Sequence, residues 1–210
     1  MKTIALVVSA RERGNCYDFA QFMLERLAAA GIKTELINFY DYKITPCQNC
    51  NYECVQKFDP EKGINAECPI QDDVKTIWKK IWEAEILLLF VPTYGGLPPA
   101  LWVAFTQRQQ GILEKPSEKE QKNFVVSAVA LASPQWSGIG ERTPSIVADQ
   151  IKNMDRKVAG FEIVNNAGFE TENLFGRLIN EKEIQRRLEF LADRTLKVAK
   201  ETLSERKKRE

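Results

Sequence analysis

The chain has 210 residues, enough for one α/β domain with a full core and too few for two of ordinary size. Apolar residues make up 44% and charged residues 28%, and 30 Lys and Arg against 29 Asp and Glu give a formal net charge of +1. That balance gives no reason to expect binding to nucleic acid or to an anionic membrane. No apolar run approaches the roughly 20 residues that cross a bilayer, and the N-terminal run is too short for a signal peptide, so we expect a cytoplasmic protein.

Strand-like and helical patterns alternate along the chain. Apolar or alternating runs predict five strands, at residues 3–8, 34–39, 85–91, 123–131 and 158–164. Helical periodicity predicts helices at residues 15–30, 74–82, about 98–113, 146–157 and 181–206. This alternation favours a three-layer α/β sandwich with a five-stranded parallel sheet. We expect a single domain over residues 1–210, with a cysteine-rich loop at about 46–70 and a long C-terminal helix at about 181–206.

The first predicted strand ends in a polar loop that leads into a helix. The loop contains Ser9, Arg11, Gly14, Asn15 and Cys16. A hydroxyl, an arginine and a run of backbone amides at a helix N-terminus can hold a phosphate monoester. The loop matches neither a Walker motif nor GxGxxG, so ATP and a Rossmann dinucleotide are poorly supported. Cys16 is interpreted as a small residue near the phosphate rather than as a nucleophile, because the chain has no histidine to activate it.

Two more loops follow the third and fourth strands, at the edge of the sheet where open α/β folds bind ligands. The loop after the third strand contains Pro92, Thr93, Tyr94, Gly95 and Gly96. Its glycines permit a planar ligand to approach the backbone closely, and Tyr94 could stack on that ligand. The loop after the fourth strand is rich in Ser and Gly, and it could cover the other side of a ring.

Four cysteines follow the second strand as Cys47-x2-Cys50-x3-Cys54-x13-Cys68. Thiolates are soft donors, and an all-sulfur set selects an iron-sulfur cluster or a structural zinc over magnesium or calcium. Structural zinc sites more often combine two Cys-x2-Cys pairs, and this chain has one. The preferred interpretation is a [4Fe-4S] cluster on these four cysteines, with zinc and unligated thiols as alternatives. We expect the loop at the ligand-binding edge of the sheet, beside a cofactor crevice.

Together these loops resemble the NADPH-dependent FMN reductase family of the flavodoxin-like fold, and in particular its iron-sulfur flavoproteins. The resemblance covers most of residues 1–165. It rests on Ser9-x-Arg11-x2-Gly14-Asn15, on Pro92-x-Tyr94-x-Gly96-x2-Pro99-Ala100 and on Gly138-x-Gly140-Glu141. It implies a flavodoxin-like sandwich that holds FMN phosphate on Ser9, Arg11, Asn15 and Cys16. It also implies that residues 92–96 wrap the flavin and that the loop from Ser133 to Gly138 closes over it. The cysteines of this chain are spaced more widely than is usual in that subfamily.

These observations predict an FMN-dependent electron-transfer flavoprotein or oxidoreductase in which flavin and cluster exchange electrons. One alternative is an NAD(P)H-dependent FMN or quinone reductase without a cluster. Another is a zinc-stabilised α/β binding module that is not an enzyme. No side chain stands out as an acid or base catalyst, so we expect none.

The resemblance also guides what we expect of partners. The electron donor would be a ferredoxin-like protein or NAD(P)H, and the acceptor a small molecule. Relatives in the family form dimers or tetramers, so a homodimer or homotetramer is expected.

Overall fold

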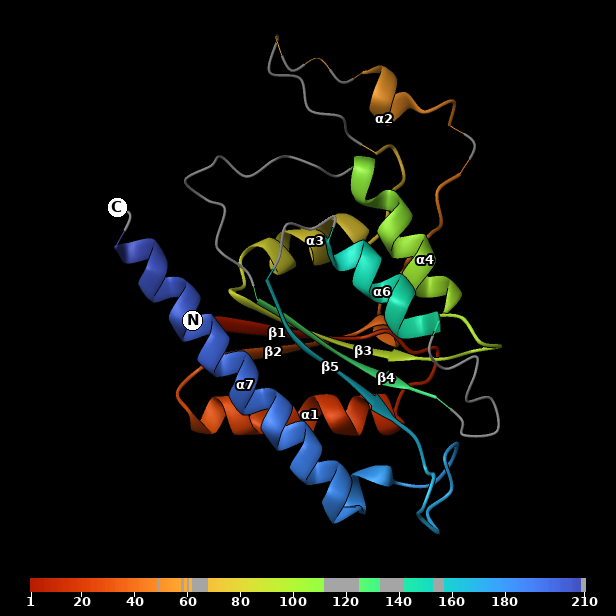
Figure 1. The fold of residues 1–210 in the computed structure, drawn as a ribbon. Helices are drawn as coiled ribbons and strands as arrows, with labels where there is room; N and C mark the ends of the chain where they lie inside the picture. Colours follow the sequence, from red (N-terminus) through yellow and green to blue (C-terminus); the bar gives the residue numbers. More distant parts are fainter. Residues whose placement is uncertain are drawn as a thin grey trace.

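The computed structural model describes residues 1–48, 50–57, 59, 61, 68–111, 125–132, 142–152 and 157–208 (Figure 1). Five strands form one sheet in the order β2-β1-β3-β4-β5, and each neighbouring pair is parallel. The strands are β1 (Lys2–Val7), β2 (Lys33–Asn38), β3 (Ile86–Pro92), β4 (Val125–Leu131) and β5 (Lys157–Val164). The predicted five-stranded parallel sheet is therefore confirmed.

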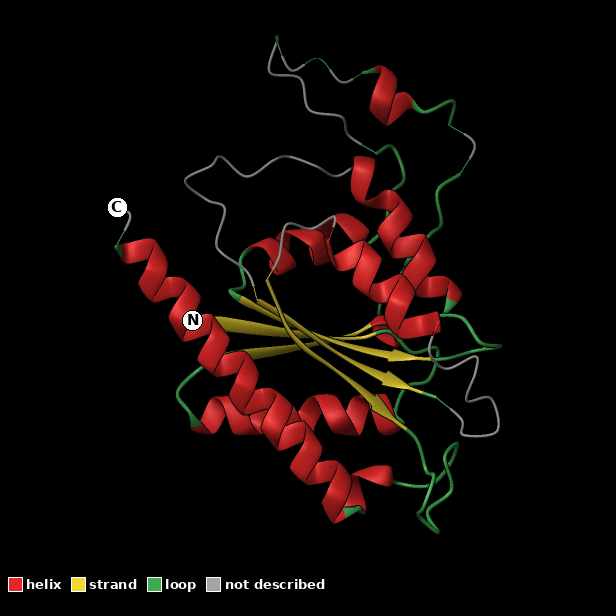
Figure 2. Ribbon diagram, viewed as in Figure 1, coloured by secondary structure: helices red, strands yellow, loops and turns green. Residues whose placement is uncertain are grey.

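Helices cover both faces of the sheet, which gives three layers (Figure 2). One face carries α1 (Asn15–Ala29) and the long α7 (Lys182–Lys207), and the opposite face carries α3 (Val74–Trp82), α4 (Ala100–Gln107) and α6 (Arg142–Lys152). Shorter helical segments complete the described structure: η1 (Phe39–Asp41), α2 (Glu53–Gln56), η2 (Arg108–Gly111) and η4 (Leu178–Asn180). None of the described helices combines the length and the apolar composition that crossing a bilayer requires.

The sheet separates two apolar cores because successive side chains of a strand point to opposite faces. On β3 all seven residues are buried, and Leu88 packs on the α1 side while Leu89 packs on the α3 side. Strands buried on both faces are almost entirely apolar, which explains why β1 and β3 read as continuous hydrophobic runs. Trp78 and Trp102 lie in the second core at 1% and 0% exposure.

The direction in which the chain crosses from strand to strand reverses between β1 and β3. From β1 the chain crosses outward to the edge strand β2, and from β3 it crosses the other way to β4. Loops that leave β1 and β3 therefore diverge to opposite faces of the sheet and leave a crevice at its carboxyl edge. Open α/β folds bind ligands at such a point, and flavodoxins, which share this strand order, bind FMN there.

Helix boundaries follow the predictions except around α4 and α6. A helix was predicted at about 98–113, but α4 covers Ala100–Gln107 and the chain continues as the 3-10 segment η2. For α6 periodicity predicted residues 146–157, but the helix begins at Arg142 and its last residue is Lys152. Pro144 lies in the first turn of the helix, where the amide has no partner within the helix, so the proline does not break it. The four-residue helix α2 inside the cysteine loop was not predicted, because one turn carries no periodic signal.

Candidate functional site

The loop after β1 carries its polar groups to the start of α1. Ser9 is 6% exposed, and its Oγ accepts a hydrogen bond from the amide of Arg11 at 3.1 Å. Gly14 precedes the first residue of α1 in an extended conformation, and the guanidinium of Arg11 lies beside it. A buried hydroxyl, a guanidinium and a helix N-terminus thus converge, which is an arrangement that suits a phosphate group.

The loop after β3 begins with a tight two-residue turn. The amide of Tyr94 donates to the carbonyl oxygen of Leu97 at 2.9 Å, and the amide of Leu97 donates to that of Tyr94 at 3.1 Å. Between them, Gly95 and Gly96 have φ values of 58° and 82°. Two consecutive positive φ values define a type I′ turn, which strongly favours glycine at both positions. This conformation explains why both residues are glycine. That a ligand approaches their backbone stays a prediction.

The two loops meet across the crevice. The Oη of Tyr94 lies 3.3 Å from the Oγ of Ser9. The hydroxyl of Thr93 donates to Thr143 of α6 at 3.0 Å, and its amide donates to Leu131 at the end of β4. Pro92 is the last residue of β3 and is buried. Among these side chains Tyr94 is the most accessible, at 41% exposure, and it is therefore the one best placed to meet a ligand.

The segment between β5 and α7 lies against the loop after β1, a contact that no sequence pattern predicted. Arg11 donates through Nη1 to the carbonyl oxygen of Leu174 at 2.7 Å and lies over the ring of Phe175, 5.3 Å from its centroid. The side chain of Asn15 donates to the carbonyl oxygen of Asn173 at 3.0 Å and accepts from the amide of Leu178 at 2.9 Å. The side-chain amide of Asn15 is thus already hydrogen-bonded within the protein. Asn15 is the first residue of α1, so its backbone remains at the crevice.

Cys16 belongs to the core rather than to the crevice. Its side chain is 4% exposed among the apolar residues beneath α1. Burial raises the pKa of the Cys16 thiol to about 12, although the nearby Arg11 opposes the shift. A thiol that stays protonated at neutral pH is a poor nucleophile, which agrees with the interpretation made from the sequence. Any contact with a phosphate at this position would come from the backbone.

The third predicted loop, with Ser133 and Gly138, lies outside the described residues. Ala132, the residue before this loop, is described. Its carbonyl oxygen accepts a hydrogen bond from the side-chain amide of Asn173 at 3.2 Å. Asn173 therefore bridges the loops that follow β1 and β4, because its own backbone carbonyl accepts from Asn15.

The cysteine loop extends over the α3/α4 layer, where α2 lies beyond the C-terminal end of α4 (Figure 1). Cys68 accepts a hydrogen bond from Arg108, the residue that follows α4. The opposite end of α4 follows the Tyr94–Leu97 turn, and the eight-residue helix between them is about 12 Å long. This differs from the expectation that the cysteines lie beside the crevice. The chain leaves β2 through η1 and then turns away from the sheet edge, which the spacing of the cysteines does not encode.

All four cysteines of the loop are free thiols, and three of them are half-buried: Cys50, Cys54 and Cys68. Burial raises the pKa of Cys54, and the neighbouring charges of the other three cysteines raise it further. The sulfurs are thus near enough to repel one another as thiolates, a repulsion that a cationic centre would relieve. Within the described part of the chain, however, no three Cys, Asp or Glu side chains are arranged to hold a metal ion. The donor set fits a cluster by its chemistry, and its ligating geometry is not assembled.

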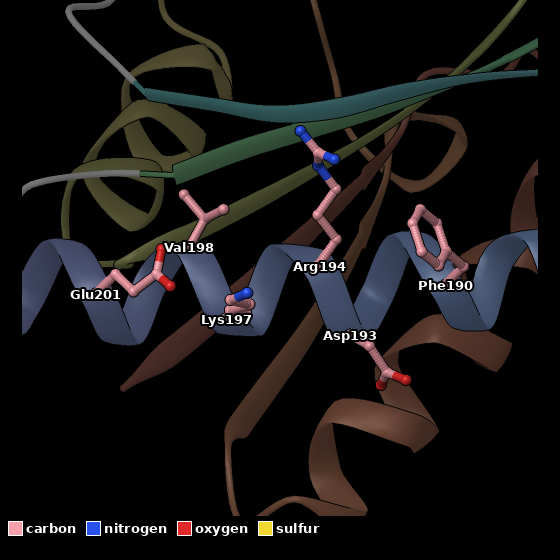
Figure 3. A pocket seen from close by; sticks show the side chains of 6 residues that line it. All are labelled: Phe190, Asp193, Arg194, Lys197, Val198 and Glu201. Atoms are coloured by element: carbon pink, nitrogen blue, oxygen red, sulfur yellow. The ribbon is translucent and has the colours of Figure 1, made fainter.

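A separate hollow of about 460 Å³ lies along α7 (Figure 3). Figure 3 shows Arg194 directed toward the strands, where its Nε donates to the carbonyl oxygen of Ala159 at 2.5 Å, and Asp193 directed toward α1, where Arg26 binds it. None of its lining residues comes from the loops described above: Phe190, Asp193, Arg194, Lys197, Val198 and Glu201. The hollow is therefore distinct from the candidate site.

The family model of NADPH-dependent FMN reductases matches residues 1–140, which include β1, β3, β4 and the loops at the crevice. The chain belongs to this family. An iron-sulfur flavoprotein of Methanocaldococcus jannaschii is 38% identical over 96 residues, which are 46% of this chain and 45% of that protein. An iron-sulfur flavoprotein of Methanosarcina thermophila is 25% identical over 146 residues, 70% of this chain and 71% of the relative. The match to the first relative thus spans less than half of its length.

Solved structures agree with the fold. The structure of RosB with a bound intermediate, 8-demethyl-8-formylriboflavin-5′-phosphate, superposes with a TM-score of 0.73 at 15% identity, covering 97% of this chain and 81% of RosB. A flavodoxin from the domain Archaea gives a TM-score of 0.54 at 14% identity, covering 96% of this chain and 99% of the flavodoxin. At these identities the likeness establishes the flavodoxin-like fold, as predicted.

Proposed function

We propose that this chain is an FMN-dependent oxidoreductase that transfers electrons between a bound flavin and a [4Fe-4S] cluster held by Cys47, Cys50, Cys54 and Cys68. The observation that carries the flavin part is the contact of Ser9 with Tyr94 across the β1/β3 crevice, next to the N-terminus of α1. Membership of the FMN reductase family supports the same assignment. When bound, flavin handles one or two electrons and the cluster handles one, so the pair can connect two-electron and one-electron chemistry.

Each loop would have a distinct task in holding FMN. The hydroxyl of Ser9, the guanidinium of Arg11 and the first amides of α1 would bind the phosphate. Residues 92–96 would follow the edge of the ring, since a type I′ turn of two glycines presents backbone without side chains. Tyr94 would contact the cofactor from its exposed side. No acid or base is assigned, because the redox chemistry is supplied by the cofactor.

The cluster part rests on the four-cysteine donor set and on the names of the relatives, which are iron-sulfur flavoproteins. We further propose a homodimer or homotetramer that receives electrons from a ferredoxin-like protein or from NAD(P)H and passes them to a small molecule. A second candidate is an NAD(P)H-dependent FMN or quinone reductase without a cluster. The family description favours it, and so does the absence of a grouped set of metal ligands among the described residues.

The deciding experiment is an absorbance spectrum of anaerobically purified protein before and after dithionite, with assays of flavin, iron, zinc and acid-labile sulfide. Flavin bands with a bleachable shoulder, and iron equal to sulfide, support the flavin-cluster protein. Flavin without iron indicates the reductase, and zinc without flavin contradicts both.

A double variant, Cys50→Ser with Cys54→Ser, should lose iron and keep FMN. Cys16→Ala is the matched control, since it removes a cysteine that is buried in the core beneath α1. It should leave the iron content unchanged.

A further inference from the structure

A buried ion pair lies at the base of the cysteine loop. Arg108 and Asp72 have side chains that are each 1% exposed, and Nη1 of Arg108 lies 2.7 Å from Oδ2 of Asp72. Nη2 donates to the other carboxylate oxygen at 3.2 Å, so the pair is bidentate. Burial acts to raise the pKa of Asp72, but the hydrogen bonds from Arg108 and from the amide of Thr45 outweigh it, and the pKa lies below its ordinary value. Both groups are therefore charged at neutral pH.

Every donor of the Arg108 guanidinium has a partner. Besides the two bonds to Asp72, Nη1 donates to the carbonyl oxygen of Thr45 at 2.9 Å and Nη2 donates to that of Ile70 at 3.4 Å. Nε donates to Sγ of Cys68 at 3.1 Å. A guanidinium has five N–H donors in a fixed planar fork, and five are used here. A lysine has three donors on one nitrogen and cannot reproduce this pattern.

The acceptors outside the ion pair lie in the cysteine loop or directly before it. Thr45 lies two residues before Cys47, and Ile70 lies two residues after Cys68. Asp72 strengthens the same junction, because its Oδ2 also accepts from the amide of Thr45 at 2.8 Å. Arg108 thus holds the two ends of the loop together, and its Nε contacts the sulfur of Cys68 directly.

We propose that Arg108 is the positioning residue of the cysteine centre. It fixes the two ends of the loop on α4, orients Cys68, and supplies an N–H···S hydrogen bond that raises the reduction potential of a cluster on that sulfur. Hydrogen bonds to ligand sulfurs and the orientation of ligands by surrounding groups are established ways in which proteins tune such centres. The tuning part of this inference rests on the proposed function; the positioning part does not.

The test uses Arg108→Lys in the full-length protein, since lysine keeps the charge opposite Asp72. The control is Arg26→Lys, because Arg26 also forms a bidentate pair, with Asp193 at 2.7 Å, but an exposed one between α1 and α7. Iron, sulfide and FMN contents are measured, together with the midpoint potential of the cluster from mediated titrations followed by electron paramagnetic resonance. A purely structural role would not move that potential.

We expect Arg108→Lys either to lose iron while retaining FMN or to keep iron with about a tenfold weaker preference for the reduced cluster, which is about 59 mV for one electron. Arg26→Lys should match the wild type in both respects. An Arg108→Lys protein with wild-type iron content and potential would overturn the proposal. Should this variant fail to fold, the double variant Arg108→Gln with Asp72→Asn removes both charges together. Its iron content and midpoint potential are then compared with those of the wild type.

A second readout separates this proposal from the cluster assignment. In protein without metal, trypsin cleavage after Lys57, within the loop, should be several-fold faster in Arg108→Lys than in the wild type or in Arg26→Lys. If the wild type contains no iron, the cluster assignment fails while the cleavage rates still judge the positioning role. Equal cleavage rates would then refute it.

Discussion

The hydroxyl oxygens of Ser9 and Tyr94 lie 3.3 Å apart although the residues are separated by 85 positions in the chain. This contact joins the two loops that diverge at the β1/β3 reversal. Ser9 also accepts from the amide of Arg11, so the ring of Tyr94 is linked to the arginine that would bind phosphate. The loop proposed to bind the phosphate and the loop proposed to follow the flavin ring are therefore directly connected.

Tyr94→Phe removes this bond and keeps the aromatic ring. A hydrogen bond of this type contributes about 0.5–1.5 kcal/mol, so we expect FMN to bind up to about tenfold more weakly. Fluorescence titration of the apoprotein with FMN measures the effect. The control Tyr40→Phe changes a tyrosine that is 53% exposed and lies in η1, after the edge strand β2. Equal affinities of Tyr94→Phe and the wild type would show that the contact does not support cofactor binding.

Arg11→Gln tests the proposed phosphate site. Charge-assisted hydrogen bonds contribute about 1.5–3 kcal/mol, so the preference for FMN over riboflavin should fall by at least about tenfold. Riboflavin lacks the phosphate, and its affinity should change little. Arg13→Gln is the comparison, because the guanidinium of Arg13 lies over the ring of Tyr17, 5.7 Å from its centroid. An unchanged FMN-to-riboflavin ratio in Arg11→Gln would place the phosphate elsewhere.

Asn15→Ala should destabilise the fold without any ligand. The substitution leaves the buried amide of Leu178 without its acceptor and the carbonyl of Asn173 without its donor. A buried group that loses its partner costs about 1–3 kcal/mol, and the Leu178 amide is buried, so chemical denaturation should show a clear loss of unfolding free energy. Asn180→Ala, at an exposed position, should stay near the wild type. A stable Asn15→Ala protein would mean that the connection before α7 rests on other contacts.

Substitutions of Gly95 test the type I′ turn after β3. Its φ is 58°, and a Cβ at this position would meet no atom within 4 Å, so any cost comes from the backbone alone. Gly95→Ala should cost about 1–2 kcal/mol of unfolding free energy. Asparagine tolerates the left-handed region better than alanine, so Gly95→Asn should cost less. Urea unfolding of the two variants gives the order, and alanine equal to or better than asparagine would contradict a turn of this type.

The Arg108–Asp72 pair predicts a loss of stability in acid. The pKa of Asp72 in the folded protein lies below its ordinary value of 3.8. A depressed folded-state pKa contributes stability that is present above pH 3.8 and is lost as the pH falls through the folded-state value. Unfolding free energies measured from pH 6 downward should therefore decline less steeply for Asp72→Asn than for the wild type. Parallel curves would show that Asp72 titrates normally.

The layers and strand positions followed from sequence because they depend on local patterns. Runs such as residues 86–91 are buried on both faces, so their composition alone identifies a central strand. The loops at the crevice were located for the same reason, since they begin where strands end. The sequence also indicated the four cysteines, although not where the loop lies relative to the crevice.

What sequence could not supply were polar contacts between distant segments. Arg108 directly follows α4, whose residues are mostly apolar, and its partners lie 36 to 63 positions away. Asn173 and Leu174 carry no motif, and their importance comes from carbonyl groups that meet Arg11 and Asn15. The one signal in the sequence was a cation inside the apolar helix predicted at about 98–113, because a charge that becomes buried there needs a partner.

The junction at Thr45, Ile70 and Asp72 makes the cysteine loop an insertion with adjoining ends. Since the ends are held together by Arg108, the length of chain between them places little demand on β2 or α3. Each doubling of a flexible loop adds only about 0.6 kcal/mol to its closure cost. The cysteine segment can therefore differ in length and in cysteine spacing, and with them in its capacity for the proposed cluster, at little cost to the sheet and to the loops after β1 and β3.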